Sequence, residues 1–111
     1  MNIPNEEHAL VEREKVVDYL LNVGHPDGFG KAEFFIAQGF KPENWDILAD
    51  ALRHLLRNFP TTKSMTSIHG KKYIVDGALR SPSGKTANVR TIWIVDAQED
   101  VPRLVTAYPK D

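Results

Sequence analysis

The chain contains no cysteine, so a disulfide framework and any site built on a thiolate are excluded. It also lacks an apolar run approaching the roughly 20 residues that a membrane-spanning helix needs. The N-terminal stretch, residues 1–7, has neither the basic start nor the apolar centre of a signal peptide. Cytoplasmic residence without a membrane is therefore the expectation.

Motifs for a metal or a cofactor are missing as well. The four histidines stand at positions 8, 25, 54 and 69, without the short spacing typical of metal ligands. The glycine and lysine spacing of a phosphate-binding P-loop is absent. The sequence predicts no cofactor and no metal site.

What is present is an ordinary globular composition with an uneven distribution of charge. The 111 residues, 41% of them apolar and 26% charged, suit one domain with a single core over residues 1–111. Residues 1–59 hold 6 Lys and Arg against 10 Asp and Glu, whereas residues 60–111 hold 8 against 5. A positive half can face a polyanion such as RNA, or it can simply be solvated differently. The charge alone leaves both readings open.

Before residue 60 the apolar residues recur at the spacing of amphipathic helices. Residues 1–8 are expected to form a flexible arm, and the helical part to cover about 9–59. Proline and glycine set the predicted helix ends, because they cannot continue the helix or favour its termination. The predicted helices are Arg13–Val23, with Val16, Tyr19, Leu20 and Val23 on its apolar face, Lys31–Gln38, and a third from Pro42 to Asn58.

From about residue 65 to 109 the period changes to two, which is typical of strands. Turn residues separate four such stretches. Three helices followed by a four-stranded antiparallel meander predict an α+β fold, with the helices on one face of the sheet and the other face partly open. Both faces carry apolar residues, so the sequence does not decide which one is covered. The predicted strands are 65–68, 72–79, 86–95 and 101–108.

A glycine-rich loop that runs from His25 to Lys31 is the first candidate for a functional site. A helix N-terminus beside a lysine and a histidine can bind a phosphate. A cation in the first turn also works against the helix dipole, which favours a role other than helix stability. The alternative is structural: the glycines permit a sharp turn, and both side chains are ordinary surface residues.

The second candidate lies on the sheet. Alternation places Thr106 and Tyr108 on one face of the last strand together with Leu104. On the preceding strand Arg90 lies on the opposite face from Trp93. Two hydroxyls and a guanidinium can bind an anion, but threonine and tyrosine are also simply good strand formers.

Several sequence motifs are shared with a known family: VDYLLN at 17–22, HP at 25–26, GKA at 30–32, FF at 34–35, GF at 39–40, W at 45, VRTIWIVD at 89–96 and VPRLVTAYP at 101–109. Together they resemble a bacterial family of small standalone proteins, the domain of unknown function family 6883. The resemblance covers about residues 10 to 109. It implies no established activity, so it supplies no catalytic residues.

A more distant resemblance is to ribonuclease toxin domains of the barnase–EndoU–colicin–RelE type, which share the helices-first order, the His-Pro and Gly-Lys loop and a terminal Thr-x-Tyr-Pro. It implies metal-independent cleavage of RNA by attack of a 2′-hydroxyl on the adjacent phosphate, and a small cognate protein as a partner. His25 would be the general base or acid, Lys31 and Arg90 would hold the phosphate, and Thr106 and Tyr108 would donate hydrogen bonds.

Two other functions compete with this one. A non-catalytic interaction module would use the open sheet face, with Trp93 and Tyr108, to bind another protein or a second copy. A small-ligand site at the glycine-rich loop is less favoured, because so short a chain has little room for a pocket beside its core. The spatial relation between His25 and Tyr108 separates the enzyme from its rivals: one cleft supports catalysis, and opposite sides of the core refute it.

Overall fold

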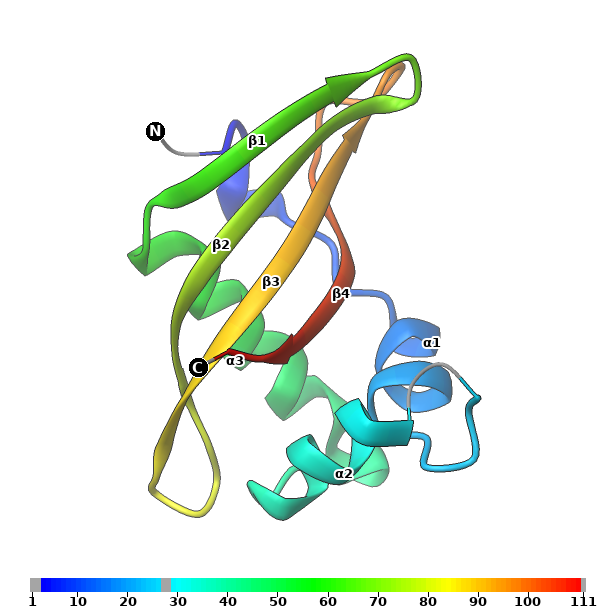
Figure 1. The fold of residues 1–111 in the computed structure, drawn as a ribbon, viewed down its shortest axis with the longest axis vertical. Helices are drawn as coiled ribbons and strands as arrows, with labels where there is room; N and C mark the ends of the chain where they lie inside the picture. The colour runs from blue at the N-terminus through cyan, green and yellow to red at the C-terminus, as the bar shows by residue number, and fades with distance from the viewer. Residues whose placement is uncertain (1–2, 27–28, 111) are drawn as a thin grey trace.

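A computed structural model describes residues 3–26 and 29–110 (Figure 1). Helical elements occupy the first half and strands the second. In chain order the elements are η1 (Glu6–His8), α1 (Arg13–Lys15), η2 (Val16–Leu20), α2 (Phe29–Ala37), η3 (Pro42–Asn44), α3 (Trp45–Asn58), β1 (Thr61–Ser67), β2 (Gly70–Arg80), β3 (Thr86–Asp96) and β4 (Arg103–Pro109).

The four strands form one antiparallel sheet in the order β1-β2-β3-β4, and the helices lie against one of its faces (Figure 1). This confirms the predicted α+β meander. The first strand begins at Thr61, four residues before the predicted start. Polar residues dominate β1, with Met65 as its one large apolar side chain, and this obscured its start in the sequence.

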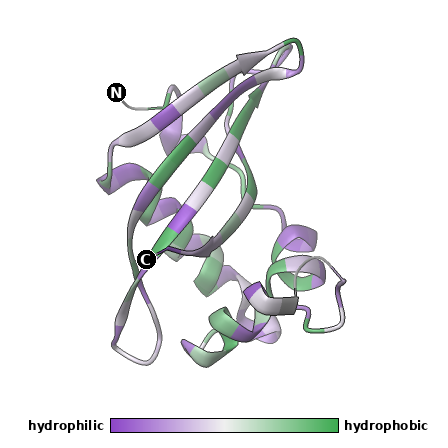
Figure 2. Cartoon of the chain, viewed as in Figure 1, coloured by the Kyte–Doolittle hydropathy of each residue, from purple (hydrophilic) through white to green (hydrophobic). Residues whose placement is uncertain are grey.

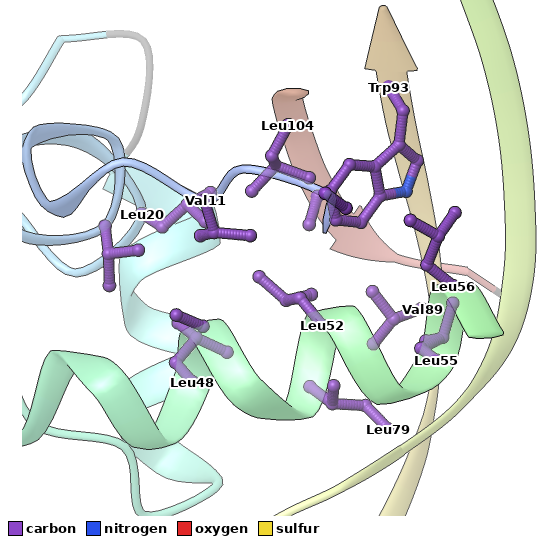
Figure 3. Packing of buried hydrophobic residues seen from close by; sticks show 14 of the residues in the cluster. Val11, Leu20, Leu48, Leu52, Leu55, Leu56, Leu79, Val89, Trp93 and Leu104 are labelled. Atoms are coloured by element: carbon purple, nitrogen blue, oxygen red, sulfur yellow. The ribbon is translucent and has the colours of Figure 1, made fainter. Parts of the chain in front are cut away.

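The core lies between α3 and the sheet (Figure 3). Hydrophilic and hydrophobic residues alternate along α3 (Figure 2). Its buried leucines lie beside Val89 and Trp93 of β3 (Figure 3). Trp93 is fully buried among the leucines of α3, and its Nε1 donates to the Thr91 hydroxyl at 2.8 Å. The face of β3 that carries Val89, Thr91 and Trp93 is therefore the covered one. An interaction surface built on Trp93 is excluded by this burial.

The first predicted helix is shorter than expected and changes its winding. After one turn of α1, the chain forms a π-helical turn, η2, in which the Leu21 amide donates to the Val16 carbonyl at 2.8 Å. The wider turn shifts the helical phase, so Leu21 is buried and Val23 is 50% exposed. The prediction that Val23 belongs to the apolar face was therefore wrong. Tyr19 lies within this turn, half-buried.

The last strand contains a bulge that the simple alternation did not predict. Trp93 pairs with Leu104 and Ile92 with Thr106, which leaves Val105 as the extra residue. Leu104 consequently points into the core, whereas Thr106 lies on the open face with Ile92. The predicted sharing of a face by Leu104 and Thr106 was wrong for this reason.

The N-terminal segment is attached to the end of the sheet. Ile3 is buried in the core, and the Asn5 side-chain amide donates to the Asp100 carbonyl at 2.7 Å. Leu10 forms a parallel bridge with Arg103 at the start of β4. The N-terminal segment is therefore held beside the start of β4, whereas the C-terminal end of β4 lies away from it (Figure 1). Within the described ranges, no helix has the length and apolar character required to cross a membrane.

Candidate functional site

The hydroxyl of Tyr19 joins three elements of the fold. The Lys31 ammonium, on α2, donates a hydrogen bond to Tyr19 Oη at 2.6 Å. The same oxygen lies 3.1 Å from Oγ1 of Thr106, on β4. Lys31 and Thr106, both predicted from the sequence and 75 positions apart in the chain, thus contact the same oxygen of Tyr19.

Further polar side chains surround the ring of Tyr19. The His25 ring packs edge-on against it, with ring centroids 5.0 Å apart. The ammonium groups of Lys31 and Lys15 lie 5.0 and 5.4 Å from the ring centroid. We call these five residues, Lys15, Tyr19, His25, Lys31 and Thr106, the Tyr19 cluster. Lys15, Tyr19 and His25 border a shallow hollow of about 480 Å³, which Glu14 and Asp18 also line.

The cluster changes the acidity of its central phenol. Burial raises the pKa of Tyr19, but the hydrogen bonds with Lys31 and Thr106 and the charges of Lys31 and Lys15 lower it by more. The net result is a pKa of Tyr19 below the ordinary value. The phenolate form of Tyr19, which can act as a base and accept hydrogen bonds, therefore forms at lower pH than that of a tyrosine in water.

Arg90 and Tyr108 form a second group on the open face of the sheet. They are cross-strand partners on β3 and β4. The Arg90 guanidinium makes two hydrogen bonds to the Asp76 carboxylate, at 2.8 and 2.9 Å, and also interacts with the Tyr108 hydroxyl. We call Asp76, Arg90 and Tyr108 the Arg90 cluster. Arg90 holds the pKa of Asp76 below its ordinary value, so Asp76 is charged at neutral pH and balances Arg90.

The two clusters are neighbours on β4. Thr106 and Tyr108 are two positions apart on the same face, a step of about 7 Å along a strand. His25, Lys31 and Thr106 thus gather around Tyr19, and Arg90 and Tyr108 lie one step further along the strand. Their catalytic roles stay predictions.

Sequence reasoning missed Tyr19 as a site residue. Its position in an apolar helical stripe assigned it to the core, and the π-helical turn that presents its hydroxyl has no sequence signature. Two hints were available: Tyr19 was the only residue in that stripe with a polar tip, and such a tip seeks a partner when buried. Asp76, which neutralises Arg90, also escaped notice because its partner is 14 residues away.

The glycine-rich loop from His25 to Lys31 connects η2 to α2. Asp27 and Gly28, in the middle of the predicted phosphate-binding loop, lie outside the described residues. The end of the loop does lead into a helix, α2, as predicted.

Among residues 3–26 and 29–110, no three histidine, aspartate or glutamate side chains are grouped so that they could hold a metal ion.

Comparison with known proteins places the chain in a family and gives it a structural relative. The model of the domain of unknown function DUF6883 matches residues 2–111. No curated protein sequence matches the chain. Its fold is similar to that of a chain in the structure of a contact-dependent growth inhibition toxin–immunity protein complex from Klebsiella pneumoniae 342. That similarity has a TM-score of 0.74 at 21% sequence identity, over 96% of this chain and 97% of the other.

Proposed function

The chain belongs to the DUF6883 family, and we propose that it is a metal-independent, ribonuclease-like domain of the toxin type, which binds and cleaves RNA. The observation that carries the proposal is the meeting of Lys31, Tyr19 and Thr106 on one phenolic oxygen beside His25. Acid–base groups, a cation and hydroxyl donors at one place are what cleavage of a phosphodiester requires. The toxin–immunity complex that contains a similar fold supports the same reading.

The reaction needs one base and one acid. The base removes the proton of a ribose 2′-hydroxyl, whose oxygen forms a bond to the adjacent phosphorus. The bond from phosphorus to the 5′-oxygen breaks, and the acid gives that oxygen a proton, which leaves a 2′,3′-cyclic phosphate and a 5′-hydroxyl. Tyr19, with its lowered pKa, and His25, against its ring, supply the base and the acid.

The remaining residues act on the phosphate. Lys31 stabilises the negative charge that develops on the phosphoryl oxygens, and Thr106 donates a hydrogen bond to one of them. Tyr108 lies one step further along β4 and Arg90 is its partner on β3, where the neighbouring phosphate of the RNA strand can bind. Because Asp76 already neutralises Arg90, that contact positions the RNA and contributes less to the chemical step.

The experiment is cleavage of a mixed pool of transfer and messenger RNA in excess chelator, with detection of 2′,3′-cyclic phosphate ends. We expect cleavage by the wild-type protein and its loss in His25→Ala and in Lys31→Ala. The matched controls are His54→Ala and Lys85→Ala, which remove exposed side chains on α3 and in the β2–β3 turn. Both controls should cleave like the wild type.

Two outcomes contradict the proposal. One is the absence of cleavage by folded wild-type protein at any concentration. The other is cleavage that His25→Ala and Lys31→Ala both retain, which would indicate a contaminating nuclease. Circular dichroism of each variant separates loss of activity from loss of the fold.

A protein-interaction module is the second candidate, because the open sheet face combines an apolar centre with fixed charges. Ile74 and Ile92 are paired neighbours there, half-buried, and Ile94 is 7% exposed. The Asp96–Arg103 ion pair lies at one end of them, with Arg103 Nε donating at 2.8 Å. Under this reading the protein binds a partner through that face and RNA stays intact.

A further inference from the structure

The outer strand β1 is the least covered part of the sheet. It pairs with β2 on one side and forms the edge of the sheet on the other. Residues 62–67 are exposed, although successive side chains point to opposite faces. Neither face of β1 is therefore packed against a helix, and the hairpin that it forms with β2 projects beyond α3 (Figure 1).

Apolar side chains are exposed on this hairpin. Ile68, in the turn, is 89% exposed, the largest fraction among the large hydrophobic residues of the described chain. Met65, on β1, is 47% exposed. Exposed apolar residues beside an open strand edge are typical of a surface that another protein covers.

The hairpin is also basic. Lys63, Lys71 and Lys72 lie between Pro60 and Val75, and no aspartate or glutamate occurs in that interval. Lys63 and Lys72 lie on the open face of the sheet, where Lys72 pairs with Met65 and Lys63 with Ile74. The exposed methionine thus has two lysines as neighbours on its face of the sheet.

We propose that the outer edge of β1 binds an extended strand of an acidic partner protein. The partner strand would pair with the main chain of β1 and place carboxylates beside Lys63 and an apolar side chain on Met65 and Ile68. A lysine and a bulge on an edge strand normally discourage pairing, and β1 has Lys63 and a register shift between Thr61 and Lys63. An acidic strand turns that lysine into an attractive contact.

The two other occupants fit less well. A second copy of the chain would bring together two hairpins that each carry three lysines and no carboxylate. The phosphates of RNA could bind the lysines, but RNA would leave the unpaired main chain of β1 and the side chain of Ile68 without partners. The surface is separate from the Tyr19 cluster, so it can bind a partner whether or not the chain cleaves RNA.

The test is selection from a display library of random peptides of about nine residues, enough to span β1 with one residue to spare at each end. The library is panned on the wild-type protein. A synthetic copy of an enriched peptide is then titrated into the wild type, the double variant Lys63→Glu with Ile68→Ser, and a control double variant. The control, Lys85→Glu with Ile47→Ser, changes an exposed lysine and an exposed isoleucine elsewhere.

We expect the enriched peptides to carry acidic and apolar residues two positions apart, on the face that meets Lys63 and Met65, and the synthetic peptide to slow amide exchange along residues 61–68. Its affinity should fall at least about tenfold in the hairpin variant and stay unchanged in the control. Each of four results overturns the proposal: no enrichment, enriched peptides without an acidic excess, binding that the hairpin variant retains, or a dimer of the free protein through β1. Binding of an RNA oligonucleotide to the hairpin, insensitive to Ile68→Ser, also overturns it.

Discussion

Replacement of Tyr19 by phenylalanine separates a catalytic role of its hydroxyl from a structural one. The change keeps the ring, and with it the contacts to His25 and the two ammonium groups. It removes the oxygen that Lys31 and Thr106 share. Each lost hydrogen bond is worth about 0.5–1.5 kcal/mol, and the half-exposed position favours the lower end. We therefore expect the free energy of unfolding to fall by about 1 kcal/mol.

The expected effect on catalysis is much larger. Loss of a general base or acid slows a reaction by about 10²–10⁴-fold, which corresponds to at least about 2.7 kcal/mol of activation free energy. A domain of ordinary stability, about 5–15 kcal/mol, stays folded after losing about 1 kcal/mol, so unfolding cannot account for such a loss.

Two measurements on the same samples decide the matter: urea unfolding followed by far-ultraviolet circular dichroism, and the initial rate of cleavage of a fluorescent RNA oligonucleotide. Tyr73→Phe, which removes a tyrosine hydroxyl on β2, is the matched control. A Tyr19→Phe rate within about threefold of the wild type, with the stability change as expected, would refute the acid–base role.

Three further predictions concern the same structure. In Lys31→Met the pKa of Tyr19 should rise, as measured by alkaline difference absorbance. The wild-type phenol has a lower pKa in the folded than in the unfolded protein, so the free energy of unfolding increases with pH between these two pKa values. This increase should be smaller in the variant. Thr91→Val should cost about 2 kcal/mol in urea unfolding, because a buried indole N–H loses its acceptor; a cost under about 0.5 kcal/mol would contradict this. Gly77→Ala should cost about 1–3 kcal/mol, because the new Cβ would lie 2.5 Å from Cδ2 of Phe59; an unchanged urea midpoint would show that the ring moves freely.

The order and type of the main elements could be predicted from the sequence because each has a strong local pattern. The leucine stripe of α3 and the β-branched run of β3 are long and periodic, and both elements occur where expected. Two irregular features could not be predicted: the π-helical turn around Tyr19 and the bulge at Val105. Each inserts one residue into a regular repeat, and tertiary packing decides where the insertion falls.

The candidate site could be predicted only in part, for a related reason. His25 and Lys31 were apparent from an unusual loop, and Thr106 and Tyr108 from their spacing on a strand. Their relation depends on Tyr19, whose hydroxyl reaches Thr106 across 87 positions of sequence. No local pattern encodes a contact of that range.

That long-range contact also determines when the site can exist during synthesis. Tyr19 is made early and Thr106 lies in the middle of the last strand, so all the helices are synthesised before their partner on β4. The Leu10–Arg103 bridge has the same property. In a ribosome-bound chain that lacks β4, Lys31 and Tyr19 are present but Thr106 and Tyr108 are not, and β3 lacks its partner strand on that side. The Tyr19 cluster can therefore assemble only after β4 has been translated.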